Sequence, residues 1–114
     1  MIDFACKRFE IKEVVRCGLS LTKAEYDILH FFISSSSWLD TEEIAKKTEL
    51  DQSTVQRAVK KLHEKGVIQR RQNNLSGGGY VYEYRAEPKE KIRKTIMTTV
   101  NNWALTVYTA LKKW

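Results

Sequence analysis

In the first half of the chain, apolar residues recur at intervals of three and four, the period of amphipathic helices. Two capping boxes mark helix starts, because Thr22 is followed three residues later by Glu25, and Asp40 by Glu43. With these starts, the pattern predicts helices over residues 10–17 (closed by Gly18), 22–33, 41–48 and 52–65.

The fourth predicted helix has both ends marked, because Asp51 is a good N-cap and Gly66 suits the left-handed position after the last turn. Val55, Val59 and Leu62 form an apolar stripe that faces a core. The other face offers amides, hydroxyls and cations without a carboxylate: Gln52, Ser53, Gln56, Arg57, Lys60 and Lys61. Such side chains bond base edges and phosphates, although a solvated amphipathic helix can show the same pattern.

After Gly66 the apolar period changes to that of β-strands. Two strands, over residues 67–72 and 80–86, are joined by the glycine-rich segment NNLSGGG and form a hairpin with a mobile tip. Alternation places Tyr80, Tyr82 and Tyr84 on one face of the second strand, and Val81, Glu83 and Arg85 on the other. Trp38 and Leu39 could add a brief strand. A hairpin is marginally stable alone, so it must pack against the helices as a wing.

Pro88 fits the first turn of a final helix that extends to Trp114. Its apolar residues are spaced 4, 4, 3, 4, 4 and 3, which keeps one stripe on one side of a nearly straight helix. They are Ile92, Ile96, Val100, Trp103, Val107, Leu111 and Trp114. A small wing domain cannot cover so long a stripe, so we expect a homodimer interface here rather than packing wholly within one chain.

The fold class that follows is mainly α with some β: a winged helix-turn-helix unit over residues 1–87 and a C-terminal dimerisation helix over 88–114. The segments LDTEEIAKKTELDQSTVQRAVKKLHEKGVIQRR and GGYVYEYRA resemble winged helix-turn-helix transcriptional regulators of the TrmB and MarR type. The resemblance implies that Ser53, Thr54, Gln56 and Arg57 approach DNA. No small-molecule effector can be carried over from the resemblance, because the sugar-binding domain of larger TrmB regulators has no counterpart here, and the effector stays unknown.

The charge of +6 is unevenly placed. Residues 1–50 carry 7 Lys and Arg against 9 Asp and Glu, whereas residues 51–114 carry 13 against 5. A positive half that begins at the fourth predicted helix suits a polyanion such as double-stranded DNA. The expected contacts from the helix are Gln52, Ser53, Thr54, Gln56, Arg57, Lys60 and Lys61. The wing, residues 70–80, is expected to reach the flanking backbone or the minor groove with Arg70 and Arg71 near its tip.

The N-terminal residues 1–9 contain Ile2, Phe4 and Phe9 among charges, so we expect this arm to pack on something. Cys6 and Cys17 match no zinc spacing, and no metal or cofactor is expected. Buried thiols that pack as small apolar side chains are the favoured reading of the two cysteines. A redox-responsive pair, which Lys7 and Arg8 would favour by promoting a thiolate, and an inter-subunit disulfide are the alternatives.

No nucleophile elbow, phosphate loop or metal motif is present, so an enzyme is not expected. Without a signal peptide or an apolar run of about 20 residues, the expected location is the cytoplasm, away from any membrane. The leading hypothesis is a sequence-specific DNA-binding regulator. A non-specific architectural DNA-binding protein and a protein-interaction module of the transcription machinery remain open, because fold alone does not fix function.

Overall fold

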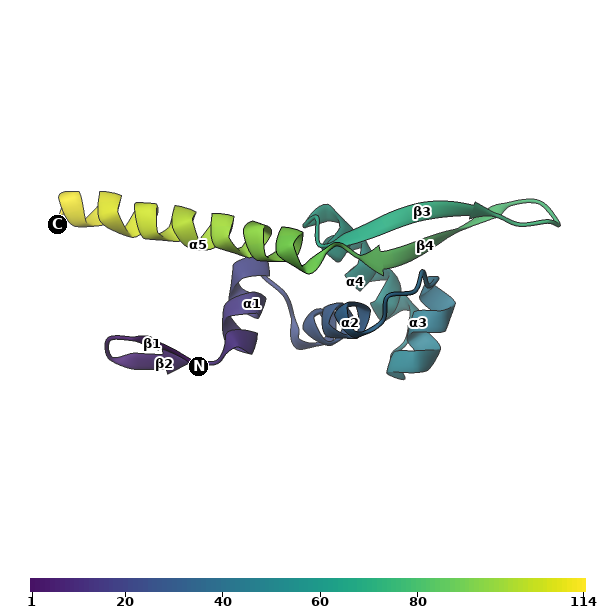
Figure 1. The fold of residues 1–114 in the computed structure, drawn as a ribbon, viewed down its shortest axis with the longest axis horizontal. Helices are drawn as coiled ribbons and strands as arrows, with labels where there is room; N and C mark the ends of the chain where they lie inside the picture. Colours follow the sequence, from purple (N-terminus) through teal and green to yellow (C-terminus); the bar gives the residue numbers. More distant parts are fainter.

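The computed structural model describes all residues from Met1 to Trp114. Along the chain the elements are β1 (Ile2–Phe4), β2 (Lys7–Phe9), α1 (Ile11–Leu19), α2 (Lys23–Ser34), α3 (Thr41–Thr48), α4 (Gln52–Glu64), β3 (Ile68–Asn74), β4 (Tyr80–Ala86) and α5 (Lys89–Lys112). The molecule is elongated, 63 × 24 × 23 Å, because α5 extends from one end of the helical body and the β3–β4 hairpin from the other (Figure 1). This arrangement confirms the winged helix-turn-helix fold and the long C-terminal helix.

The helix starts are those that the sequence predicted. Thr22 and Asp40 each accept a hydrogen bond from the backbone of the glutamate three residues on, and each glutamate bonds back, which completes both capping boxes. The backbone N–H of Thr54 donates to Asp51 over 3.3 Å, and Gly66 follows α4 with a φ of 78°. These features form because a cap needs only residues within one turn of each other.

One apolar core holds the helices and the base of the hairpin together. Val55, Val59 and Leu62 of α4 are almost fully buried in it, as the stripe predicted. The remaining core residues are Leu19, Leu21, Ile28, Leu29, Phe32, Leu39, Ile44, Ala58, Val67, Ile68, Tyr84 and Ile92. α4 is therefore fixed on its apolar side, and its polar side is left facing water.

The wing is longer than predicted, because its strands stay paired from Ile68 and Ala86 out to Asn74 and Tyr80. Leu39 adds a third, one-residue strand by exchanging two backbone hydrogen bonds with Tyr84, at 3.0 and 2.8 Å. This bridge confirms the brief strand predicted at Trp38 and Leu39. It attaches the base of the hairpin to the loop between α2 and α3.

The sequence predicted that the first helix ends at Gly18, and this prediction is wrong. α1 continues to Leu19 and is capped by Ser20, which adopts a left-handed conformation with φ 56°. Gly18 lies inside the helix, where a Cβ atom would come within 3.0 Å of the Cγ2 atom of Ile96 on α5. The glycine therefore allows α1 to pack closely against α5. The helix ends one residue later, at Leu19.

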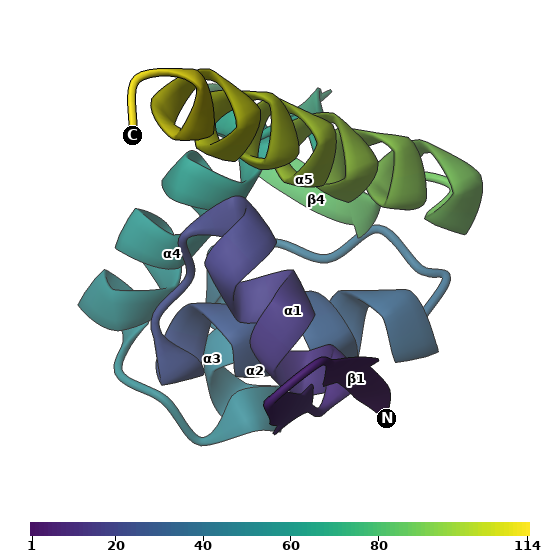
Figure 2. The ribbon, with the colours of Figure 1, turned by 90° about the vertical axis from the view of Figure 1, so that its left-hand side faces the viewer.

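The N-terminal arm forms a small antiparallel hairpin, β1–β2, which lies below α5 and in front of α1 when the molecule is viewed along its long axis (Figure 2). The Phe4 ring meets the Trp103 ring of α5 edge-on at 6.2 Å. Ile2 and Phe4 nevertheless stay largely exposed. The expectation that this arm packs on something is met only by that one aromatic contact.

Candidate nucleic-acid interface

The start of α4 is fixed by polar contacts that leave its outer face free. Asp51 accepts hydrogen bonds from the Ser53 hydroxyl and the Thr54 backbone, and the Ser53 bond foremost holds the pKa of Asp51 below its ordinary value. The Gln52 amide reaches the Thr41 hydroxyl at the start of α3 over 3.5 Å. This contact sets α4 relative to α3, as a helix-turn-helix requires.

The predicted reading face of α4 is a continuous polar surface. Its exposed members are Gln52, Ser53, Gln56, Arg57 and Lys60, all on the side away from the buried stripe. Thr54 is half-buried at the edge of this face. None of these side chains is held by an ion pair, so amides, a hydroxyl and two cations are available to one ligand.

Lys61 departs from the prediction that it contacts DNA. Its ammonium group lies 2.9 Å from the Glu25 carboxylate of α2, and both side chains are partly buried. Burial alone would raise the pKa of Glu25, but bonds from Thr22 and Lys61 bring it below the ordinary value. Lys61 therefore neutralises a carboxylate that the capping box of α2 brings to the inside of α4.

The two predicted wing arginines lie on opposite faces of the hairpin and away from its tip. Arg70 pairs in register with Tyr84, and its guanidinium lies over the Tyr82 ring at 4.4 Å. Burial raises the pKa of the Tyr84 hydroxyl, which lies near the same guanidinium. Because the strands extend to Asn74, Arg70 occupies the inner half of the wing rather than its end.

On the other face, Arg71 bonds Glu83 at 2.9 Å and stacks over the Trp38 ring at 4.4 Å. Arg85 covers the same ring at 4.6 Å. Neither Trp38 nor Arg85 was among the residues expected in the site. Strand alternation places Arg85 beside Glu83, but no local signal shows that Trp38, before α3, reaches the hairpin.

The outer end of the wing carries no charge, because no Lys, Arg, Asp or Glu lies between Arg71 and Glu83. Leu75 and Tyr80 are exposed there, and Gly78 and Gly79 turn the chain with φ values of 96° and 78°. The turn is closed by backbone bonds from Leu75 to Gly79 and from Gly78 to Leu75. This end offers apolar and amide groups to a ligand rather than cations.

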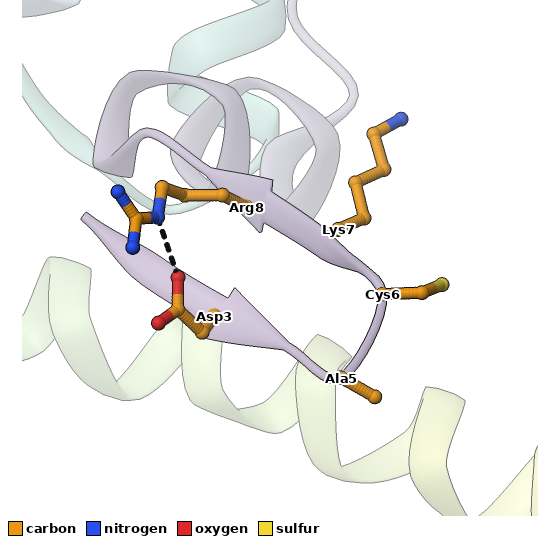
Figure 3. Close-up of a pocket in the computed structure, with 5 residues that line it drawn as sticks. All are labelled: Asp3, Ala5, Cys6, Lys7 and Arg8. Carbon is orange, nitrogen blue, oxygen red and sulfur yellow. Dashed lines mark hydrogen bonds and ion pairs between the residues drawn. The ribbon is translucent and has the colours of Figure 1, made fainter.

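Both cysteines are free and exposed, so the interpretation of buried thiols is wrong. Cys6 lies at the turn of the N-terminal hairpin, beside a shallow hollow lined by Asp3, Ala5, Lys7 and Arg8 and closed by the bond from Arg8 to Asp3 (Figure 3). Cys17 lies on α1, beside an open groove. The redox pair stays a prediction. No three His, Cys, Asp or Glu side chains are grouped so as to hold a metal ion.

The apolar stripe of α5 divides into two parts. Ile92 is buried in the core and Ile96 packs against it, so these two predicted dimer contacts lie inside the chain itself. From Val100 onward the helix has left the body, and Trp103 and Leu111 are 57% and 55% exposed. The rest of the stripe, Val107 and Trp114, is also exposed. Neither this helix, which is the longest, nor any other has an apolar stretch long enough to cross a membrane.

Comparison with known proteins places the chain in a family. The family model described as the DnaD N-terminal domain matches residues 10–106, which span α1 to most of α5. The uncharacterized protein MJ1503 of Methanocaldococcus jannaschii is 31% identical over 114 residues, which is 100% of this chain and 83% of the relative. The match does not confirm membership of the TrmB or MarR type.

Solved structures share the fold. One described as "Possible transcriptional regulator from Methanosarcina mazei Go1" is 49% identical, with a TM-score of 0.94 over 100% of this chain and 96% of that one. ST1889 from Sulfolobus tokodaii is 24% identical, with a TM-score of 0.70 over 84% and 93%. A variant of S. aureus MepR bound to an oligodeoxyribonucleotide is 15% identical, with a TM-score of 0.58 over 87% and 72%. The last two show the fold alone.

Proposed function

The chain belongs to the DnaD N-terminal domain family, and within that family we propose that it is a sequence-specific, double-stranded DNA-binding transcriptional regulator that acts as a homodimer. One observation carries the proposal. The face of α4 opposite its buried stripe is an exposed row of amides, a hydroxyl and cations with no ion-pair partners. A merely solvated helix face would accept carboxylates equally well, whereas a major groove favours the amides, hydroxyl and cations that this row carries.

In the proposed complex the first half of α4 lies in the major groove. Gln52, Gln56 and Arg57 read base edges with their paired donor and acceptor groups, since bidentate bonds distinguish one base pair from another. Ser53 and Thr54 add hydroxyl contacts. Lys60 contacts phosphate, because a single ammonium charge carries little sequence information. Lys61 is not part of this proposal, because Glu25 already neutralises it.

The wing contributes phosphate contacts beside the groove. Arg70 and Arg71 are both exposed at the inner half of the hairpin, and we assign them to the DNA backbone that flanks the α4 site. Arg71 makes the weaker phosphate contact of the two, because its bond to Glu83 offsets part of its charge. The wing therefore positions the domain on the duplex, while α4 supplies the choice of sequence.

The likeness to the Methanosarcina mazei protein supports the proposal, because 49% identity over the whole chain is accompanied by nearly the same backbone. That protein is described as a possible transcriptional regulator. The MepR variant supports only the geometry, since a fold shared with a protein that was crystallised with an oligodeoxyribonucleotide can be placed on DNA. Nothing in this family resemblance points to an enzyme.

Dimerisation is proposed through the exposed part of α5, so the units are residues 1–87 for DNA and 88–114 for pairing. No charged residue lies between Lys94 and Lys112, and the apolar stripe is half-buried at Val100 and exposed at Trp103, Val107, Leu111 and Trp114. An isolated helix of this kind loses stability in water, whereas a second copy buries the same stripe. Two copies of α4 would then read half-sites about 34 Å apart.

The experiment begins with selection of bound sequences from a random duplex pool, followed by affinity measurements on the selected operator. Arg57→Ala should weaken specific binding by about 1–3 kcal/mol and relax the preference at one base position. Arg93→Ala is the matched control, because Arg93 is an exposed arginine of α5 and its loss changes the net charge equally. It should leave the base preference unchanged.

Three results would contradict the proposal in whole or in part. If selection yields no preferred sequence and the affinity ratio between duplexes stays near one at fixed salt, the protein is an architectural binder that contacts phosphate. If Arg57→Ala and Arg93→Ala behave alike, Arg57 does not read bases. If the wild-type protein binds no DNA at all, a protein-interaction module of the transcription machinery is favoured instead.

A further inference from the structure

The inner face of the wing carries a column of aromatic side chains beside Arg70, and the proposed duplex contacts use only the arginine of this column. Register places Arg70, Tyr82 and Tyr80 on the side of the hairpin whose base packs on the core. The Arg70 guanidinium covers the Tyr82 ring at 4.4 Å, and Tyr80 meets Tyr82 edge-on at 5.3 Å. The column ends at Tyr80, which is 55% exposed. An exposed aromatic side chain at the end of such a column can take one more planar group.

The other groups on this face fit the same kind of ligand. Gln72 and Asn74 lie between Arg70 and the tip, and the Gln72 amide donates to the Asn74 carbonyl over 3.1 Å. No carboxylate lies on this side of the hairpin, because Glu83 points to the opposite face and bonds Arg71. A neutral to positive surface with aromatic and amide groups matches nucleobases attached to a phosphate strand.

The opposite face provides the contrast. There the Trp38 ring is already covered by the guanidinium groups of Arg71 and Arg85, at 4.4 and 4.6 Å. Its stacking surface is used within the protein. The tip is also unlike a phosphate-binding wing, since it carries no Lys or Arg between Arg71 and Arg85. Intact duplex DNA hides its base faces, so the open ring of Tyr80 has a partner only where bases are unpaired.

The geometry points to a second DNA-binding activity, in which the wing stacks unpaired bases of single-stranded DNA on Tyr80 while Arg70 contacts the adjoining phosphate. The occupant is DNA because this wing and α4, whose exposed row matches a DNA groove, belong to one domain, so this inference rests on the proposed function. This activity goes beyond the proposed reading of duplex sequence. Together the two surfaces would hold the junction between a duplex site and an opened strand.

The test uses the full chain and a fluorescein-labelled thymidine oligomer of about 20 nucleotides, long enough for several binding modules, in fluorescence anisotropy titrations. Tyr80→Ala should weaken binding about tenfold, because base stacking on one aromatic residue contributes on this scale. Tyr80→Phe retains the ring and should stay within about twofold. The ratio between wild type and Tyr80→Ala should not change with salt, since stacking releases no counterions.

Asn73→Ala is the matched control, because Asn73 is exposed, lies one residue from Asn74 and occupies the opposite face. It should bind the oligomer as the wild type does. Equal affinity of wild type and Tyr80→Ala, or equal losses in Tyr80→Ala and Asn73→Ala, would overturn the inference. Tighter binding to a uridine RNA oligomer of the same length would overturn the assignment to DNA. Operator binding by the wild type is measured in parallel, so failure of the proposed function is seen separately.

Discussion

α4 and α5 begin from the same kind of sequence and end in different environments. Both carry an apolar stripe at helical spacing, but Val55, Val59 and Leu62 of α4 are almost fully buried, whereas Trp103 and Leu111 of α5 are more than half exposed. The polar sides of the two helices differ in their charge. α4 presents unpaired cations to water, and α5 has no charge at all between Lys94 and Lys112.

The difference supports our proposal for the surface on which each helix meets a partner. The stripe of α4 is satisfied inside the chain, so its function lies on its polar side. The stripe of α5 is satisfied only as far as Ile96, so from Val100 onward its apolar side is the surface that needs a partner. Burial of one stripe and exposure of the other therefore separate the surface that we propose for DNA from the surface that we propose for the dimer.

The largest expected effect is on assembly. Replacing Val100 and Val107 with Glu places carboxylates in the centre of the proposed seam, and each uncompensated buried charge costs about 3–5 kcal/mol. The double variant should be monomeric by light scattering at concentrations where the wild type is a dimer. The control replaces Asn102 and Thr109 with Glu on the opposite, exposed side of α5, which should leave the dimer intact. A dimer that survives the first pair would move the interface to the N-terminal hairpin and α1.

The next effect separates the two stripes within one chain. In the monomeric background, Leu62→Ala should lower the free energy of unfolding by about 2–5 kcal/mol, because it leaves a cavity in the core. Leu111→Ala removes the same atoms from an exposed position and should change it by less than about 0.5 kcal/mol. Urea denaturation followed by circular dichroism measures both. Equal losses would mean that α5 folds back on its own chain.

The smallest effect concerns Glu87, where the wing passes into α5. Glu87 is 8% exposed, and its bond from Lys91 holds the pKa of its carboxyl below the ordinary value. Since the folded pKa is lowered, the carboxylate stabilises the fold above the unfolded pKa of about 4.3 and loses that effect as pH falls through the folded pKa. Glu87→Gln should therefore cost about 1 kcal/mol at neutral pH, because the bond is to a mostly exposed lysine.

Urea denaturation at neutral pH and at a pH below about 4 tests this prediction. The difference in the free energy of unfolding between wild type and Glu87→Gln should disappear in acid. Glu90→Gln is the control, since Glu90 and its partner Lys94 are both exposed and 3.7 Å apart. It should have little effect at either pH. If this difference in the free energy of unfolding stays constant with pH, the packing of the side chain at position 87, and not its charge, accounts for the lost stability.

Most of the fold could be predicted because its signals are local. The caps at Thr22, Asp40 and Asp51 each depend on residues within one turn, and the buried stripe of α4 depends only on helical period. The same period placed the exposed row of α4 on one face. These elements and the order in which they occur were enough to indicate a winged helix-turn-helix and a surface for DNA.

The failures are all cases in which distant residues decide. Gly18 suggests a helix end, but its contact with Ile96 keeps it inside α1. Lys61 shares the pattern of a DNA contact, but Glu25, 36 residues away, neutralises it. Trp38 reaches Arg71 and Arg85 only because the bridge from Leu39 to Tyr84 brings that loop to the hairpin. Local rules cannot place such pairs.

The amino-acid sequence by itself determined the helices, the hairpin and the polar face of α4, because caps, turns and periodicity act within a few residues. Only the tertiary structure decided which cations are free, where the core ends along α5, and which aromatic side chain of the wing is left open. Those outcomes depend on which residues pack together across the fold. The same packing leaves Arg57 and Tyr80 exposed and buries Ile92.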